Sequence, residues 1–203
     1  MLQTAAGGRG TVVFLRGDDG DWALRHYHRG GLPGRFLEDH FLWLGAEQTR
    51  SFREWRLLRR LHVRGLPVPR PIAARYRRRG LAYTADLMTA RIPGAEPLSA
   101  RLARAPLSPD AWRRIGRCLR RFHDAGVFHA DLNAHNLLLD ETGKPWVLDF
   151  DRGRLRPAGA WRRRNLERFL RSLRKLDAGR SGIHAGAGDW AALLEGYGDD
   201  PAR

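Results

Sequence analysis

Three side chains between residues 131 and 149 have the types and spacing that phosphoryl transfer requires. Asp131 and Asn136 lie five positions apart in HADLNAHNLLLD (residues 129–140), and Asp149 follows in WVLDF. Such a reaction needs metal ions on the phosphates, a carboxylate near the attacking hydroxyl and a cation that offsets charge. Asp131 is therefore the candidate catalytic base. Asn136 and Asp149 offer the hard oxygen ligands that Mg²⁺ prefers.

The elements predicted around these residues would bring them to one edge. Ser108-Pro109-Asp110 is typical of a helix start, with an N-cap hydroxyl and proline at the first helical position. After this helix, the apolar runs NLLLD and WVLDF predict two strands joined by a turn. Asn136 begins the first strand and Asp149 ends the second, so the hairpin returns both to the same edge. The alternative, that Asp131 and Asn136 only cap turns, leaves Asp149 unexplained.

The first half of the chain is predicted to be β-rich with one helix. Residues 10–27 read as a β-hairpin, and residues 72–76 and 81–88 as two more strands. A glycine cluster at residues 7–10 leaves little room for a strand before it. A helix is predicted over residues 47–64 from an apolar stripe at three-residue spacing. The stripe consists of Phe52, Trp55, Leu58 and Leu61.

These elements predict an α+β fold with two lobes. The first, residues 1–90, is a small antiparallel β-lobe with one helix. The second, residues 91–203, is rich in helices, and residues 92–97 connect the two. The length suits a single domain made of both lobes.

Composition limits the class of protein and the kind of partner. The chain has 203 residues and a net charge of +15, and only two of its 37 basic residues are lysines. Such a charge predicts an anionic partner: nucleic acid, an acidic membrane face or a phosphorylated substrate. The sequence contains no run of 18 apolar residues, so it predicts no membrane span. Its N-terminus does not resemble a signal peptide. The single cysteine, Cys118, excludes an internal disulfide and fits a reducing cytosol.

HADLNAHNLLLD followed by VLDFD resembles the catalytic and metal-binding loops of the protein-kinase-like fold. The resemblance implies ATP and Mg²⁺ as cofactors, with Asp131 catalytic and with Asn136 and Asp149 on the metal. It also makes the first lobe nucleotide-binding and GGRGTVVF its phosphate-covering loop, with Gly8 and Gly10.

Protein kinases also use a lysine on the third strand to hold the α- and β-phosphates, and a glutamate on the helix that pairs with it. No lysine precedes Lys144 in this chain. The resemblance places Arg25 in the position of that lysine and Glu54 in the position of the glutamate. Two alternatives remain: Arg25 as an exposed strand residue, and Glu54 as part of a capping box that begins at Ser51.

Ala130, the sequence DFD and the short segment after Asp151 depart from regulated protein kinases, so a small-molecule or lipid-linked hydroxyl is the expected acceptor. Nearly the whole sequence resembles a narrower family, the bacterial 3-deoxy-D-manno-octulosonic acid (Kdo) kinases, which are related to lipopolysaccharide heptose kinases. The resemblance rests on LRHYHRGGLPGRF, TRSFREWRLLRRL, GLPVPRPIAA, HADLNAHNLLLD and LDFDRGRLR.

This family resemblance implies a phosphotransferase that uses ATP to phosphorylate Kdo on a lipid A precursor, at its 4-hydroxyl. It implies a peripheral protein on the cytoplasmic side of the inner membrane, with no obligate protein partner. The basic residues of 26–35 and 162–175 are expected to meet the anionic lipid. Trp43 and Trp161 are either interfacial anchors or core residues.

Two other functions stay open. One is a heptose kinase or another small-molecule kinase of the same fold. The other is a non-catalytic, basic nucleic-acid-binding module, which would not need Asp131 and would bind less tightly as salt rises. No nucleic acid is expected as a partner, because the sequence lacks an aromatic RNA-binding strand or a recognition helix.

Overall fold

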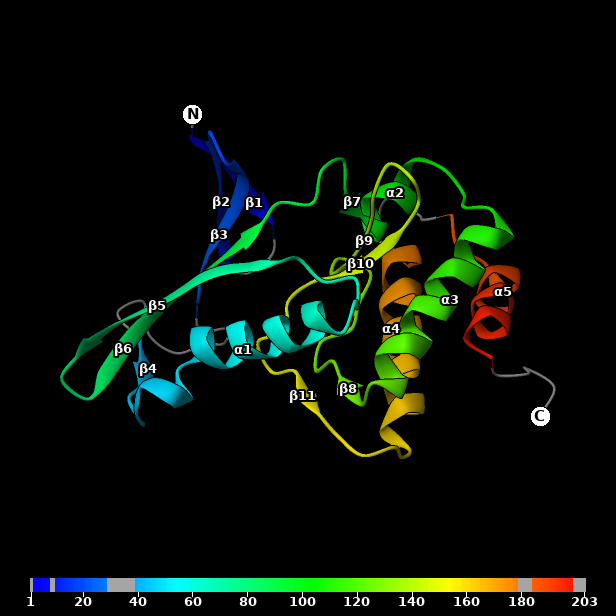
Figure 1. Cartoon of the computed structure of the whole chain (residues 1–203). Coiled ribbons are helices and arrows are strands. Elements are labelled where there is room, and N and C mark those ends of the chain that lie inside the picture. Colours follow the sequence, from blue (N-terminus) through cyan, green and yellow to red (C-terminus); the bar gives the residue numbers. More distant parts are fainter. Residues whose placement is uncertain (1, 8–9, 29–38, 179–183, 199–203) are drawn as a thin grey trace. The chain divides into compact units, whose positions relative to one another are not determined.

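The computed structural model describes residues 2–7, 10–28, 39–178 and 184–198 and forms two compact units (Figure 1). The first comprises Met1–Arg64 and Pro69–Arg91, and the second comprises Gly65–Val68 and Ile92–Arg203. The division after Arg91 lies next to the boundary expected from the sequence. Residues 65–68, however, belong to the second unit, where the Val147 N–H donates to the Pro67 carbonyl oxygen (3.0 Å).

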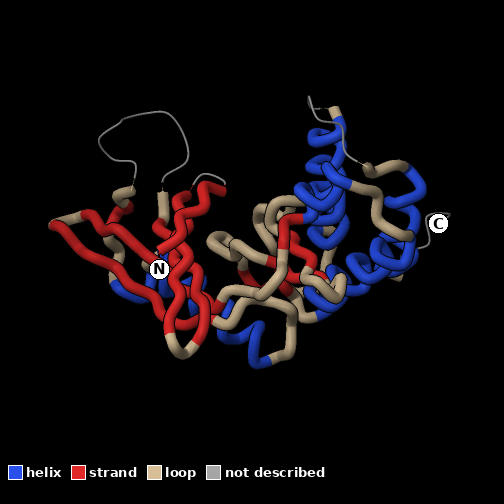
Figure 2. The backbone as a smooth tube through the Cα atoms, turned by 90° about the horizontal axis from the view of Figure 1, so that it is seen from above, coloured by secondary structure: helices blue, strands red, loops and turns tan. Residues whose placement is uncertain are grey.

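The first unit is an antiparallel sheet with one long helix, and strands dominate it in Figure 2. Neighbouring strands follow the order β1-β2-β3-β6-β4, and β5 also pairs with β6. The strands are β1 Leu2–Gly7, β2 Gly10–Gly17, β3 Gly20–His26, β4 Phe41–Leu42, β5 Pro71–Arg79 and β6 Ala82–Ala90. The helical elements are η1 Ala46–Gln48 and α1 Arg50–Val63.

The sequence predicts most of this unit but not its first strand. The hairpin over residues 10–27 is present as β2 and β3. The expectation that little room is left for a strand before the glycine cluster is wrong, because β1 pairs with β2 along its full length. The sequence LQTAAG does not alternate regularly between apolar and polar residues as a half-buried strand does, which is why β1 escapes prediction.

Helix α1 begins after its N-cap residue Thr49 and packs on β5 and β6. Leu58 and Leu61 of the predicted stripe are buried, whereas Phe52 and Trp55 are half-buried. The buried face also carries the carboxylate of Glu54. A charged group on the buried face of a helix requires partners, and they are found in the candidate site.

The second unit contains four helices in its described part, together with two small sheets. The helices are α2 Leu98–Arg104, α3 Pro109–Asp124, α4 Trp161–Asp177 and α5 Ala187–Tyr197. The sheets have the strand orders β10-β9-β7 and β11-β8. The strands are β7 Glu96–Pro97, β8 Val127–Phe128, β9 Leu137–Leu139, β10 Pro145–Val147 and β11 Arg154–Leu155.

Helix α3 has the predicted start, since Ser108 Oγ accepts a hydrogen bond from the Ala111 N–H (3.3 Å). The apolar face of α3 contributes to the core of this unit. Trp112, Ile115, Leu119 and Phe122 are all buried.

Glycine residues allow α3 and α5 to pack closely. A Cβ atom on Gly116 would lie 2.0 Å from the Leu193 carbonyl oxygen, and one on Gly196 would lie 2.2 Å from the Arg113 carbonyl oxygen. Neither distance is sterically allowed, so each helix needs a glycine at the crossing. The tight crossing brings Tyr197 of α5 against α3.

None of the helices in the described part of the chain has the length and apolar character needed to cross a membrane.

Candidate active site

The loop between β8 and β9 joins Asp131 and Asn136 through its own hydrogen bonds. The Asn136 Nδ2 donates to the Asp131 carbonyl oxygen at 2.9 Å, and the Asn133 Nδ2 donates to the same atom at 3.0 Å. Asn136 makes this hydrogen bond with its amide nitrogen. Its Oδ1, the atom through which an asparagine ligates metal, does not take part in the bond. The Asp131 carboxylate is 64% exposed and therefore accessible to a substrate.

His129 ties this loop to Leu148, next to the candidate metal ligand Asp149. Its Nε2 donates to the Leu148 carbonyl oxygen (2.8 Å), and its Nδ1 accepts from the Asp131 N–H (3.2 Å). Burial lowers the pKa of the His129 imidazole, so the ring is neutral, as both bonds require. These contacts give His129 a structural role in holding the loop.

Asp149 reaches the same edge through the backbone. The Leu148 N–H donates to the Asn136 carbonyl oxygen (2.8 Å), which places Asp149 one residue from that bond. Asp149 has a φ of +63°, and it is the single non-glycine residue with positive φ among those that the structure describes. Such a conformation costs free energy and often marks a functional position. The next residue, Phe150, is buried against the rings of His129 and Phe122.

The donor atoms at this edge fit a magnesium ion that is also bound by phosphates. The described residues contain no group of three or more His, Cys, Asp or Glu that could hold a metal by itself. Mg²⁺ commonly takes one or two protein ligands and fills its other positions with phosphate oxygens and water. Asn136 and Asp149 would supply two oxygens of the required kind.

Arg168 is a site residue that sequence reasoning missed. From α4, its Nη1 donates to the Asp131 Oδ1 at 3.2 Å. The same helix supports the loop again at Ser172, whose Oγ accepts from the Ala134 N–H (3.1 Å). Helix α4 therefore places a permanent positive charge on the candidate base.

A buried polar network fixes the backbone at His129. The Asn165 Nδ2 donates to the His129 carbonyl oxygen (2.7 Å). The Asn165 Oδ1 lies 3.3 Å from His123 Nε2, and the other nitrogen of His123 lies 2.7 Å from the Tyr197 hydroxyl. Burial lowers the pKa of His123 to about 4, which keeps the imidazole neutral. Helices α3, α4 and α5 thus meet behind the catalytic loop.

The first unit holds a separate group of candidate residues. Arg25 on β3 forms an ion pair with the Glu54 Oε2 of α1, and the Tyr27 hydroxyl donates to the same oxygen (2.6 Å). The Glu54 side chain is 2% exposed. Burial, and then the Glu54 carboxylate, raise the pKa of Tyr27. The expected pairing of Arg25 with Glu54 is therefore present.

The two alternatives for these residues are not supported. Glu54 lies beyond the first turn of α1, since the N-cap is Thr49, and a capping box starting at Ser51 is excluded. The Ser51 hydroxyl instead donates to the Arg75 carbonyl oxygen (2.9 Å). Arg25 is 22% exposed and is held by its buried partner, so it is not a solvated strand residue.

The glycine loop can be followed only in part. Gly10 opens β2 opposite Gly7 of β1, whereas Gly8 lies outside the described residues. Their role in covering phosphates stays a prediction.

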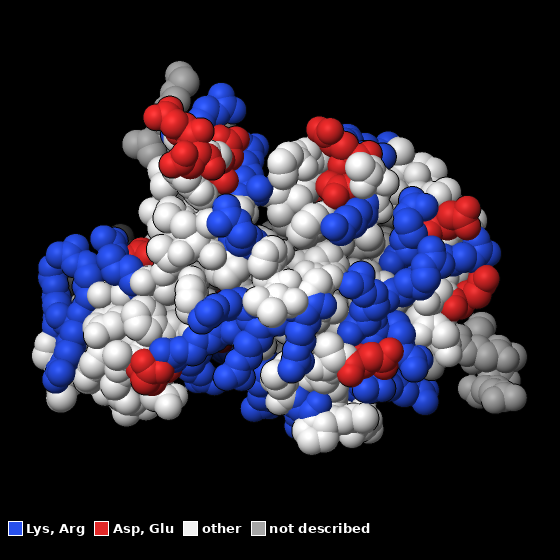
Figure 3. All heavy atoms as spheres, in the orientation of Figure 1, with Lys and Arg blue, Asp and Glu red and all other residues white. Residues whose placement is uncertain are grey.

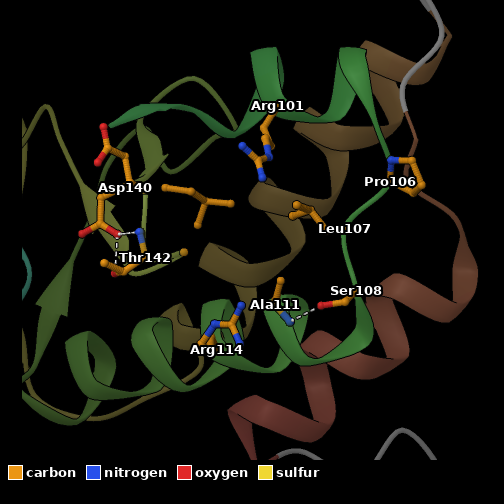
Figure 4. A pocket seen from close by; sticks show the side chains of 11 residues that line it. Arg101, Pro106, Leu107, Ser108, Ala111, Arg114, Asp140 and Thr142 are labelled. Atoms are coloured by element: carbon orange, nitrogen blue, oxygen red, sulfur yellow. Dashed lines mark hydrogen bonds between the residues drawn. The ribbon is translucent and has the colours of Figure 1, made fainter. Parts of the chain in front are cut away.

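A cavity of about 290 Å³ in the second unit is not lined by the candidate catalytic and metal-binding residues (Figure 4). Arg101 of α2 and Arg114 of α3 face it from opposite sides, and Asp140 and Glu141 also line it. The Asp140 carboxylate is already satisfied by the Thr142 hydroxyl and the Trp146 indole. Asp131, Asn136 and Asp149 are absent from its lining, so we assign the chemistry to the exposed loop edge.

An aspartate and an asparagine five residues apart, followed by an Asp-Phe pair just after the next strand, are typical of the phosphotransferases of the protein-kinase-like fold. The chain belongs to the lipopolysaccharide kinase (Kdo/WaaP) family, whose model matches residues 3–197.

Its relatives carry the name 3-deoxy-D-manno-octulosonic acid kinase. One from Stenotrophomonas maltophilia is 50% identical over 192 residues, which cover 94% of this chain and 76% of the relative. One from Vibrio parahaemolyticus is 46% identical over 191 residues, which cover 94% and 80%. One from Xylella fastidiosa is 46% identical over 192 residues, which cover 94% and 76%.

Proposed function

We propose that this chain transfers the γ-phosphoryl group of ATP to the 4-hydroxyl of Kdo on a lipid A precursor, in the assembly of the lipopolysaccharide inner core. The observation that carries the proposal is the loop edge where Asp131, Asn136 and Asp149 are joined by side-chain and backbone hydrogen bonds. The relatives named as Kdo kinases support the choice of acceptor.

In the proposed reaction, the acceptor oxygen forms a bond to the γ-phosphorus while the bond to the β,γ-bridging oxygen breaks and ADP leaves. Asp131 accepts the hydroxyl proton, and Arg168 orients its carboxylate. Asn136 and Asp149 would hold Mg²⁺, which offsets phosphate charge when bound.

Arg25 takes the part of the lysine that kinases use on the α- and β-phosphates. Its planar guanidinium can bind two phosphate oxygens at once, and Glu54 holds it in place. Gly8 and Gly10 would let the backbone approach the phosphates.

We further propose that the protein works peripherally at the cytoplasmic side of the inner membrane. A lipid-linked acceptor requires access to that surface. The net charge of +15 favours binding to anionic lipid, because each basic side chain near such a surface contributes about 1 kcal/mol.

Mass spectrometry of Kdo-bearing lipid A precursor, incubated with the protein, ATP and Mg²⁺, tests the proposal. One added phosphate on the sugar is expected with the unchanged protein and not with Asp131→Asn. Phosphorylation of a heptose-bearing core instead would identify the related sugar kinase. Equal turnover by Asp131→Asn would show that the catalytic assignment is wrong.

A further inference from the structure

Exposed leucines gather at one end of the sheet in the first unit. Of the five large apolar side chains that are exposed where side chains are described, three lie here: Leu42 (63% exposed), Leu44 (70%) and Leu81 (77%). Leu42 of β4 pairs with Ala82 of β6, and the Trp43 N–H donates to the Leu81 carbonyl oxygen (2.9 Å). Backbone hydrogen bonds therefore hold the three leucines close together.

The same end of the sheet carries consecutive exposed arginines. Arg77, Arg78 and Arg79 end β5 just before the turn to β6, and Arg79 also lies opposite Ala82. Figure 3 shows basic side chains crowded over the tip of this hairpin, next to uncharged surface. Of the acidic residues in the adjoining segment, Glu47 is paired with Arg56, and the single carboxylate of Asp39 does not offset three arginines. The tip therefore keeps a positive charge.

Packed aromatic rings support this end of the sheet. The Trp43 ring packs on Tyr76 (centroids 4.9 Å apart) and lies edge-on to Tyr83 (6.0 Å). The Arg78 guanidinium covers the same indole at 5.1 Å. Trp43 is thus engaged within the unit, and the apolar groups left to contact a partner are the leucines.

We propose that Leu42, Leu44 and Leu81 with Arg77–Arg79, here called the leucine tip, insert into an anionic lipid surface. Apolar side chains projecting beside a ring of arginines match the boundary between acyl chains and anionic headgroups. This inference rests on the proposed function in one respect, namely that a lipid-linked acceptor gives the protein a reason to bind the membrane.

The other expected contact regions fit lipid insertion less well. The outward positions of α4 are mostly basic, whereas its apolar residues Leu166, Phe169 and Leu173 are buried. Trp161 is 4% exposed and donates to the Pro157 carbonyl oxygen, so it is a core residue and not an anchor. Helix α4 can attract anionic lipid, but its other leucines, Leu170 and Leu176, are half-buried, and none of its large apolar side chains is exposed. Of the expected loop 26–35, residues 29–35 lie outside the described part.

Sedimentation with vesicles tests the leucine tip directly. We compare phosphatidylcholine vesicles with and without phosphatidylglycerol, using the full chain without nucleotide or acceptor. The triple variant Leu42→Ser/Leu44→Ser/Leu81→Ser is expected to bind the anionic vesicles at least about tenfold more weakly. Val63→Ser is the matched control, because Val63 is 79% exposed and lies at the opposite end of α1 from η1.

A second variant tests the charge. Replacing Arg77, Arg78 and Arg79 by glutamine is expected to weaken binding on the order of 100-fold, at about 1 kcal/mol for each arginine. It should also reduce the dependence of binding on salt. Thermal unfolding of the leucine variant should match that of the unchanged chain, since its three side chains are exposed. The arginine variant also loses the Arg78 contact with Trp43 and should unfold at a slightly lower temperature.

Three results would overturn the inference. Vesicle binding that is equal for the triple variant and Val63→Ser would remove the leucine tip from the interface. Equal binding to vesicles with and without phosphatidylglycerol would remove the role of charge. A dimer seen by light scattering and lost in the triple variant would assign the tip to a second copy of the chain.

Activity on detergent-dispersed acceptor separates this inference from the proposed function. The triple variant should phosphorylate dispersed acceptor normally while losing activity on acceptor in vesicles. If the unchanged chain binds vesicles through the tip but phosphorylates neither form, the proposed function fails while the membrane contact stands.

Discussion

The Arg168 guanidinium of α4 donates to the carboxylate of Asp131, which lies 37 residues earlier in the chain, at 3.2 Å. Both side chains are about half exposed or more, so water weakens their attraction and the pair contributes little to stability. Its value is geometric, since a guanidinium fixes the direction in which the carboxylate accepts a proton.

Substituting Arg168→Gln should therefore lower kcat on the order of 10- to 100-fold and leave the KM for ATP nearly unchanged. Arg168→Lys should restore part of the loss, because an ammonium group keeps the charge but not the fork. Steady-state kinetics measure both effects. Arg171→Gln, an exposed change on the same helix, is the control and should behave like the unchanged chain. A purely structural role would instead lower the unfolding temperature of Arg168→Gln.

Arg25→Ala should raise the KM for ATP or lower kcat by a factor of at least about ten, because it removes the proposed phosphate contact. It should also cost about 2 kcal/mol of unfolding free energy, since the buried Glu54 carboxylate would lose the ion pair with Arg25. Nucleotide titrations and urea unfolding measure the two effects. Arg25→Lys, which restores the residue that kinases use, should retain more of both. Unaltered constants in Arg25→Ala would refute its role.

Two substitutions of Asp149 should have the same effect on activity but different effects on stability. Asp149→Gly and Asp149→Ala both remove the proposed metal ligand and should both be inactive. Only glycine adopts a φ of +63° without strain, so Asp149→Gly should be more stable than Asp149→Ala by about 1 kcal/mol. Urea unfolding of the two variants gives the difference. If they unfold alike, the left-handed conformation is absent in solution.

Stability should fall as pH drops through the range set by His123. Its pKa is about 4 in the folded chain and 6.5 when unperturbed. Between pH 6.5 and pH 4, His123 is therefore protonated in the unfolded chain but neutral in the folded chain. The free energy of unfolding from this group declines between pH 6.5 and pH 4, by up to roughly 3 kcal/mol.

Urea unfolding across this pH range measures the decline, with His123→Gln as the comparison. Glutamine can bond to Tyr197 and Asn165 but does not titrate, so its unfolding free energy should depend less on pH. Equal slopes for the two proteins would mean that His123 is already accessible to protons in the folded state.

Local patterns allowed the reactive residues to be predicted, while long-range contacts could not be read from the sequence. Asp131, Asn136 and Asp149 share one loop and hairpin, so their spacing alone brings them together. The role of Glu54 is ambiguous in the sequence, because a glutamate at this position fits both a capping box that begins at Ser51 and an ion pair with a distant cation. Its partner Arg25 settles the choice only in the folded sheet. Arg168 is one of many basic residues on α4, and nothing in its neighbourhood distinguishes it from Arg171.

Helix α5 and the leucine tip were not predicted, because the sequence around each carries no local signal for it. Helix α5 contains two internal glycines, Gly188 and Gly196, which lower its helix propensity. Its stability comes from the glycine crossing with α3, which is a property of two segments 80 residues apart in the chain. The leucine tip was likewise invisible, because Leu42 and Leu81 become neighbours only when β4 pairs with β6.

An arginine at position 25 also has a consequence for chemical biology. Acylating nucleotide probes identify kinases in cell extracts by labelling the lysine beside the bound phosphates. The two lysines of this chain, Lys144 and Lys175, both lie in the second unit, and β3 offers such reagents a guanidinium that they do not acylate. With Arg25 in the proposed phosphate-binding role, an inventory of ATP-using enzymes made with such probes would pass over this protein, and a guanidine-directed reagent such as a phenylglyoxal would be the suitable label.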